Sequence, residues 1–360
     1  MSARISAVAL GASAAAAVLL AGCSGSGHAG TAGNLVPDSV ARQQVRQTGP
    51  FARPLSLLDL LPPDRTAPSQ SLVFETGFQP DGAQRLAVTE YGPPSSGASQ
   101  FNIYAVPDKK NVAPTCTTTT YAGLNSLGVD SKHTVWLPDG ATDTVVTLPE
   151  GSCDAGTFTL NEPNGQPADV AFGKKDTVFI SDIAGNNSTA GSISVYPKGK
   201  TSPTSSLTNP NVFLSFGIAA DKAGDVFQTY ESSASAFGIL EFAGGAGSGS
   251  AVTVKGISVP IGITFDKTQR LLVADAGLND VLVYAPPYNG KSPAVTIALK
   301  GSPVIAKLDA ANKNLYVTDR TNGTVDVYSY PAGKYEYSIS NGLSASDDPT
   351  GVAVDPASAE

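Results

Sequence analysis

Histidine, tryptophan, methionine and cysteine are scarce in this 360-residue sequence, with two, one, one and three copies respectively. His28 lies in a Ser/Gly-rich segment and His133 follows Lys132 in a turn-like segment. Neither position favours the general acid–base chemistry for which enzymes most often use histidine. The Gly-x-Ser-x-Gly motif of hydrolases and the His-Glu-x-x-His motif of zinc proteases do not occur. The sequence therefore favours a protein that is not an enzyme.

Basic clusters are also missing. No run of lysine or arginine is longer than two residues, and the net charge is −8. Nucleic-acid-binding proteins carry a basic stripe or patch, so we do not expect this protein to bind nucleic acid. The acidic balance also disfavours adsorption of the folded part to anionic lipid.

The N-terminal region reads as an export signal and a linker. Residues 1–22 contain one arginine and then an apolar run from Ile5 to Leu20, as in a secretory signal peptide. Leu20 to Cys23 reads Leu-Ala-Gly-Cys and resembles a bacterial lipobox, which implies cleavage before Cys23 and a diacylglyceryl group on its sulfur. The alternative is an ordinary signal peptide with an incidental cysteine. Residues 23–70, rich in Ser, Gly and Pro, are expected to form a flexible linker.

One phrase recurs at intervals of about 45 residues in the rest of the chain, residues 71–360. It reads Gly-(Ile/Val)-Ala-Val-Asp, then a few polar residues, then a run such as Leu-Tyr-Val-Thr-Asp. The copies are Leu127–Asp130 with Val135–Asp139, Asp169–Gly173 with Val178–Asp182, Gly217–Asp221 with Val226–Tyr230, Gly262–Asp266 with Leu271–Asp275, Ile305–Asp309 with Leu315–Asp319, and a final Gly351–Asp355.

Each unit contains four short strand-like runs. The first run is apolar on both faces, the second and third alternate, and the fourth is poor in large apolar residues. An order from a buried strand to a weakly hydrophobic edge strand is typical of a propeller blade. We therefore predict an all-β fold, a six-bladed β-propeller over residues 71–360.

The two ends of the repeat predict how the ring closes. Leu86–Glu90 reads as a second strand without a preceding first strand, and Gly351–Asp355 as a first strand without a following second strand. We predict that they pair in one blade, so that the N- and C-terminal strands close the propeller. Ser71–Phe78 is the competing candidate for the same inner position.

At this spacing the repeat resembles the NHL family of β-propellers. The resemblance covers about residues 70–360 and implies a six-bladed fold like that of NHL and SMP-30-type proteins. Gly173, Tyr230 and Lys307 depart from the repeated pattern. Because such propellers include scaffolds, binding modules, lactonases and lyases, the resemblance indicates the fold far better than the activity.

The acidic ends of the second strands are the strongest repeated polar feature. Five carboxylates and one tyrosine occupy this place, and together they could bind a cation: Glu90, Asp139, Asp182, Asp275, Asp319 and Tyr230. Aspartate at a strand end also caps turns, and repetition in every blade favours that structural role. Asn125, Asp169 and Asn211 lie in entry loops where single metal ligands could sit.

Cys116 and Cys153 remain after the predicted lipid attachment at Cys23. In an exported protein the default is a disulfide, and a ring of repeats would bring their two loops side by side. Closing this loop would stabilise the chain by roughly 3–4 kcal/mol.

The sequence favours an extracytoplasmic, membrane-anchored lipoprotein that presents one propeller face to a protein, glycan or small-molecule ligand, with no cofactor. A metal-dependent hydrolase of lactonase type, or a lyase, using a divalent cation is the alternative. Sugar binding would require exposed aromatic residues, for which Tyr121, Trp136 and Tyr230 are the candidates. A ligand site is expected where the repeat breaks, at Gly173, Tyr230, Lys307 and the entry loops of unequal length.

Overall fold

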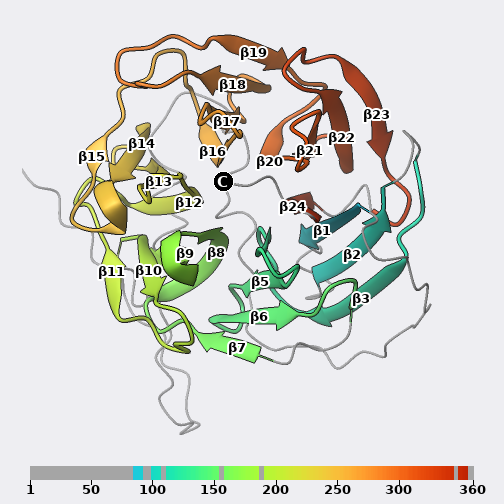
Figure 1. Ribbon diagram of the computed structural model, residues 1–360, viewed down its shortest axis with the longest axis horizontal. Coiled ribbons are helices and arrows are strands. Elements are labelled where there is room, and N and C mark those ends of the chain that lie inside the picture. The colour runs from blue at the N-terminus through green and yellow to red at the C-terminus, as the bar shows by residue number, and fades with distance from the viewer. Residues whose placement is uncertain are drawn as a thin grey trace, which may run out of the picture. The chain divides into compact units, whose positions relative to one another are not determined.

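The computed structural model describes residues 84–91, 99–106, 111–153, 158–185, 190–343 and 348–355. All of them belong to a compact unit spanning Val36–Glu360. They form six four-stranded antiparallel sheets arranged as a ring around a central channel (Figure 1). Within these ranges no helix is long and apolar enough to cross a membrane. The predicted cleavage and lipid sites, and the linker, lie outside the described residues.

The six sheets are the blades of a propeller, numbered here in chain order from the innermost strand outward. Blade 1 contains β24 (Asp348–Asp355), β1 (Arg85–Tyr91), β2 (Ser99–Ala105) and β3 (Cys116–Tyr121); blade 2 contains β4 (Gly128–Val129), β5 (Val135–Asp139), β6 (Thr144–Leu148) and β7 (Phe158–Asn161); blade 3 contains β8 (Gly165–Phe172), β9 (Val178–Gly185), β10 (Ser192–Tyr196) and β11 (Ser205–Leu207).

The second half of the ring repeats the same order. Blade 4 contains β12 (Leu214–Ala220), β13 (Val226–Glu231), β14 (Phe237–Phe242) and β15 (Ser250–Ala251); blade 5 contains β16 (Pro260–Phe265), β17 (Leu271–Asp275), β18 (Asp280–Tyr284) and β19 (Val295–Ala298); blade 6 contains β20 (Pro303–Leu308), β21 (Asn314–Asp319), β22 (Thr324–Ser329) and β23 (Tyr335–Ile339).

Ring closure follows the predicted pairing. β24 is the inner strand of blade 1 and pairs antiparallel with β1, with Leu86 opposite Val354 and Ala87 opposite Ala353. Leu86 and Val354 are almost completely buried. The competing segment Ser71–Phe78 lies outside the described residues. The C-terminal strand therefore supplies the inner strand, as the sequence pattern predicts.

Burial decreases from the channel to the rim, as the hydrophobic pattern predicts. Every residue of β12 and β16 is buried, whereas both residues of β15 are exposed. Neighbouring blades pack through large apolar side chains; between blades 4 and 5 the rings of Phe227 and Phe265 lie 5.0 Å apart. Because each blade covers the next, the apolar faces of the sheets are largely buried and the outer strands are the most exposed.

Buried hydroxyl groups join the second strand of a blade to the inner strand, or the segment before it, of the next blade. The residue before the second-strand acid is often Ser or Thr, and its side chain donates to a backbone carbonyl of the next blade. Thr89 Oγ1 donates to Asn125 O at 2.5 Å, Ser181 Oγ to Phe216 O at 2.6 Å and Thr229 Oγ1 to Ile261 O at 2.5 Å. These hydrogen bonds help to satisfy buried carbonyls in the crowded centre of the ring.

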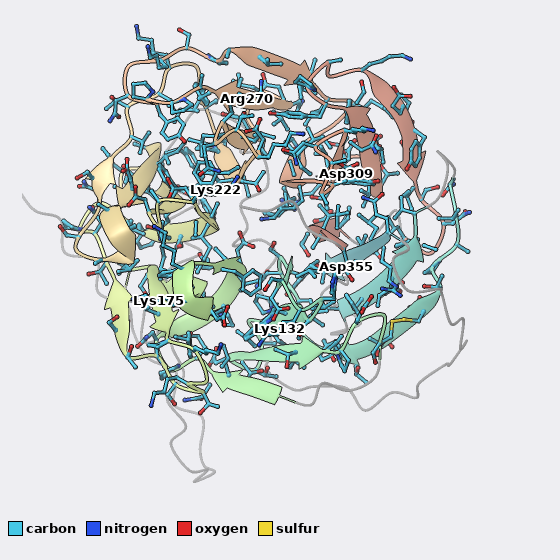
Figure 2. All side chains as sticks on the ribbon, in the orientation of Figure 1. Lys132, Lys175, Lys222, Arg270, Asp309 and Asp355 are labelled. Carbon is cyan, nitrogen blue, oxygen red and sulfur yellow. A yellow bond between two sulfur atoms is a disulfide. The ribbon has the colours of Figure 1, made fainter. Side chains whose placement is uncertain are left out.

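The two ends of the ring differ in the turns that they carry. We call the end with the turns between first and second strands the AB face (residues 130–134, 173–177, 221–225, 266–270 and 309–313). The opposite end, with the turns between second and third strands, is the BC face. Figure 2 labels AB-face residues around the channel: Lys132, Lys175, Lys222, Arg270, Asp309 and Asp355.

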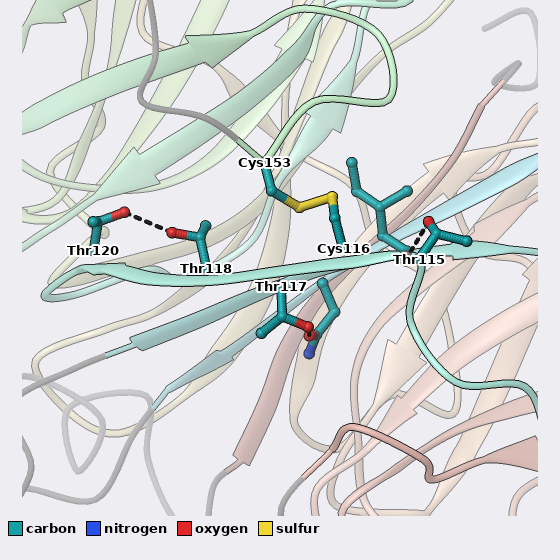
Figure 3. The surroundings of a disulfide bond; sticks show 8 residues. Thr115, Cys116, Thr117, Thr118, Thr120 and Cys153 are labelled. Atoms are coloured by element: carbon teal, nitrogen blue, oxygen red, sulfur yellow. Dashed lines mark hydrogen bonds between the residues drawn. A yellow bond between two sulfur atoms is a disulfide. The ribbon is translucent and has the colours of Figure 1, made fainter. Parts of the chain in front are cut away.

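Cys116 and Cys153 form the predicted disulfide, with an S–S distance of 2.03 Å and a Cα–Cα distance of 6.1 Å (Figure 3). Cys116 opens β3 in blade 1, and Cys153 follows β6 in blade 2. The disulfide therefore ties the blade that closes the ring to its neighbour.

Candidate functional site

Three of the predicted cation-face acids are engaged by the backbone of nearby turns. Asp275 accepts hydrogen bonds from the amides of Ser258 (2.6 Å), Val259 (2.9 Å) and Gly277 (3.0 Å). Asp139 accepts one from Ala141 at 3.0 Å, and Asp319 one from Thr321 at 2.9 Å. These are the contacts expected of turn-capping residues.

The remaining members of that set contact side chains instead. Glu90 Oε2 accepts from Gln100 Nε2 at 3.0 Å, and Asp182 Oδ2 accepts from Ser192 Oγ at 3.1 Å. Tyr230 lies opposite Gly238 on the neighbouring strand. Among the described residues, no three of these second-strand acids bring their oxygens within 4.8 Å of one another. Shared cation binding by this face stays a prediction.

Two of the three entry-loop candidates also form structural hydrogen bonds, and the third lies apart from them. Asn125 Nδ2 donates to Pro167 O at 3.1 Å, and Asp169 Oδ2 accepts from the amide of Ile218 at 2.9 Å. Both side chains are buried between inner strands, where they join blades 2, 3 and 4. Asn211 lies in an exposed turn. The structure does not bring these three residues to one point.

A buried acid pair not predicted from the sequence lies between blades 2 and 3. Ser194 Oγ lies 2.8 Å from Glu162 Oε1 and 3.0 Å from Asp182 Oδ2, and Tyr196 Oη donates to Glu162 Oε2 at 2.5 Å. Burial and the neighbouring Glu162 raise the pKa of Asp182 well above its usual range, and burial also raises the pKa of Glu162. The pair therefore holds a proton more tightly in the folded chain than in the unfolded chain.

Stability is expected to decrease as pH rises. A carboxyl group whose pKa is raised on folding stabilises the fold below its unfolded pKa, and this contribution is lost as pH rises through the folded pKa. Asp139, Asp169 and Asp319 share the upward direction, and burial beside Asp275 raises the pKa of Asp280 to about 6. The contribution of Asp280 is therefore lost between about pH 4 and pH 7. We expect the thermal midpoint to be several degrees higher at pH 5 than at pH 8.

Asp182→Asn tests how much the acid pair contributes to this pH dependence, because it removes a proton-binding group without changing side-chain size. It is expected to raise the midpoint at pH 8 by roughly 3 °C or more and to change it little at pH 4. Asp176→Asn is the control, since Asp176 is exposed and paired with Lys198. A midpoint that rises steadily from pH 5 to pH 8 would contradict this interpretation of the acid pair.

A cavity of about 710 Å³ opens on the AB face between blades 2 and 3. Its walls come from strands and turns of both blades, from the inner strands β4 and β8 out to β7 and the turn after β10. It extends into the channel end, where Thr264, Lys307 and Val354 from three other inner strands line it. One side is aromatic: the rings of Trp136 and Phe172 meet edge to face at 5.8 Å.

Two of the three departures from the repeat line this cavity. Gly173 stands where the other blades carry an aspartate, so the cavity lacks a carboxylate there. Lys307 stands at a position that is apolar or threonine in the other copies, and it is half-buried at the channel end. Tyr230, the third departure, does not line it. The sequence identified these positions, but their convergence on one cavity depends on the ring geometry.

His133 lines the same cavity and belongs to a charged cluster between blades 1 and 2. Its Nδ1 pairs with Asp355, while Arg85 pairs with Glu150 and lies 3.8 Å from Asp355. The hydrogen bond to Asp355 raises the pKa of His133. Ligand atoms of His133, Glu150 and Asp355 lie within 4.8 Å of one another. The positive charge of Arg85 already interacts with both carboxylates, so the cluster is a set of ion pairs that links blades 1 and 2.

Comparison with solved structures supports the architecture. One chain of a structure described as "Crystal structure of Nidogen/Laminin Complex" superposes with a TM-score of 0.57 at 16% sequence identity, over 76% of this chain and 98% of that chain. The fold is a six-bladed β-propeller. A "Streptogramin B lyase structure" matches at a TM-score of 0.47 and 14% identity, over 67% of this chain and 72% of that one. No protein-family model matches the chain, and no curated protein is significantly similar to it.

Proposed function

We propose that the protein is a binding propeller whose ligand occupies the cavity between blades 2 and 3. The observation that carries this proposal is the meeting of Gly173 and Lys307, two breaks in the repeat, in one cavity. A residue with a structural role recurs in each blade, whereas a residue that contacts a ligand is needed once. The other repeat acids discussed above take part in structural hydrogen bonds.

The dimensions and lining of the cavity support the same proposal. Small-molecule sites usually have volumes of about 300–1,000 Å³ and combine apolar or aromatic walls with a few polar groups. The cavity of about 710 Å³ has Trp136 and Phe172 on one side and lysines at its mouth and channel end. The metal-dependent alternative has less support, because most of its candidate ligands bond to backbone groups of the blades.

The N-terminal sequence adds a location to this proposal. A lipid on Cys23 followed by the linker of residues 24–70 would hold the propeller at the outer side of a membrane. The solved chain with the same fold comes from a nidogen/laminin complex, so the fold is compatible with a role in binding. Such a tethered propeller would present its cavity to a ligand outside the cytoplasm.

Blocking the cavity tests the proposal. The probe is N-phenyl-1-naphthylamine, a neutral dye whose fluorescence rises in apolar sites. Thr134 lines the cavity, and its side chain forms no hydrogen bond with described residues, so Thr134→Trp fills space without removing one. We expect this variant to weaken saturable dye binding at least about tenfold.

The background for this test is the full chain carrying Cys23→Ala, which prevents lipid attachment and avoids detergent. Ala310→Trp is the matched control, because Ala310 is exposed on an AB turn of blade 6 and does not line the cavity. Dye bound elsewhere on the chain is common to both variants. Equal dye affinity in Thr134→Trp and Ala310→Trp would overturn the proposal.

A further inference from the structure

The charges that line the cavity do not cancel. Of its two aspartates, Asp176 pairs with Lys198 at 2.6 Å. Asp130 accepts from the amides of Lys132 and Thr134, both at 2.9 Å, and from Trp136 Nε1 at 3.1 Å. The ammonium groups that remain, on Lys132, Lys200 and Lys307, form no hydrogen bond or ion pair with described residues. The cavity therefore has a positive lining.

Lys307 is the least exposed of these groups. It is half-buried at the channel end, where an ammonium ion loses part of its hydration. The carboxylate that interacts electrostatically with Lys307 is that of Asp169. Its two oxygens accept hydrogen bonds from the amides of Val170 (3.0 Å) and Ile218 (2.9 Å). A partly dehydrated cation that forms no direct ion pair with described residues is unfavourable, and an anionic group of a ligand would restore its interactions.

The surrounding AB face extends the positive field beyond the cavity. Lys174 Nζ donates to Ala223 O at 2.5 Å, Lys222 Nζ to Lys267 O at 3.0 Å and Lys267 Nζ to Ala311 O at 3.3 Å. Each lysine thus reaches the turn of the next blade around the ring. Figure 2 labels one of them, Lys222. Because the acceptors are neutral carbonyls, these hydrogen bonds do not offset the positive charges of the lysines.

Most turn aspartates of the same face are less exposed than the lysines; Asp176, which pairs with Lys198, is the exposed one. Asp266 is 1% exposed and pairs with Arg270, and Asp309 is 4% exposed and accepts from the amide of Lys313 at 2.8 Å. The exposed charges of the AB face are therefore mainly positive, although the net charge of the whole chain is −8. Such a face attracts anions from solution and directs them toward the cavity.

We infer that the ligand is an organic anion, with an apolar ring-containing body against Trp136 and Phe172 and a carboxylate, sulfonate or phosphate group beside Lys307. This inference rests on the proposed function, because it names the ligand class of the same cavity. Lys132 and Lys200 at the mouth add longer-range attraction. Lys307 is the residue that distinguishes an anion from a neutral ring of the same shape.

A pair of dyes separates charge recognition from shape. 8-Anilino-1-naphthalenesulfonate and N-phenyl-1-naphthylamine share one ring system and differ in the sulfonate. In the Cys23→Ala chain, we expect the sulfonate dye to bind more tightly than the neutral dye. Lys307→Met, which keeps side-chain length, should weaken sulfonate binding at least about tenfold and neutral-dye binding by less than about twofold.

Lys291→Met is the matched control, because Lys291 is an exposed lysine of blade 5 that does not line the cavity. It should leave both affinities unchanged. If Lys307→Met weakens both dyes equally or neither of them, the charge inference is wrong while cavity binding stands. If Thr134→Trp affects neither dye, the proposed function itself fails, and the inference with it.

Discussion

A chain that ends at Gly342 is expected not to form a closed propeller. This truncation removes β24, the inner strand of blade 1. Val352, Ala353 and Val354 of that strand are at most 4% exposed, and their loss would uncover Leu86 and Val88 of β1. Burying each valine side chain contributes about 1.5–3 kcal/mol, before the hydrogen bonds of the ladder are counted. The total is comparable to the 5–15 kcal/mol by which whole domains are stable.

The measurement is thermal unfolding followed by circular dichroism, with limited proteolysis as a second readout. A chain that ends at Asp355 is the matched control, since it keeps all of β24. We expect the control to unfold cooperatively and the shorter chain to show no cooperative transition. A cooperative transition within a few degrees of the control would contradict closure by β24. It would then favour Ser71–Phe78 as the inner strand.

Replacing Cys23 with alanine is expected to release the protein from membranes. A diacylglyceryl group carries two acyl chains, and each buried methylene adds about 0.8 kcal/mol, so two chains give stable anchoring. Without them only electrostatic adsorption of the AB face would remain. Washing in 1 M salt suppresses that contribution, because the Debye length falls to about 3 Å.

Membrane fractionation after the salt wash, followed by immunoblotting, measures this effect. We expect about nine-tenths of the Cys23→Ala protein in the soluble fraction. Ser24→Ala should behave like the unchanged chain, since the lipid attaches to the cysteine sulfur. Retention of the Cys23→Ala protein in salt-washed membranes would show that the Leu-Ala-Gly-Cys segment is not a lipid attachment site.

The repeat made much of the fold predictable. Side chains of inner strands such as β12 pack against blades on both sides, so their apolar character is visible without knowledge of the partner. The unpaired halves at Leu86–Glu90 and Gly351–Asp355 also predicted the closing blade correctly. The same reasoning predicted the disulfide between Cys116 and Cys153, because it depends only on which loops of neighbouring blades share one side.

The candidate site and the other contacts between blades were less predictable, because each of them forms between two repeats. Glu162 follows the last strand of blade 2, and Asp182 ends the second strand of blade 3, so nothing in the repeat places them together. His133 reads as a turn residue, and its partner Asp355 is 222 residues away. A recognisable signal did exist for the hydroxyl bridges. Ser or Thr precedes the second-strand anchor at residues 89, 181 and 229, which bridge to the next blade, and at 318, whose hydroxyl bonds to Ile305 within its own blade.

A crystal structure of the Cys23→Ala chain with bound 8-anilino-1-naphthalenesulfonate would test the central claim most directly. We expect the naphthalene ring beside Trp136 and Phe172 and the sulfonate within hydrogen-bond distance of Lys307 Nζ. The same crystal grown from Lys307→Met should show a markedly lower dye occupancy at this place. Dye bound on the BC face, or elsewhere on the AB face with the cavity filled only by solvent, would contradict the claim.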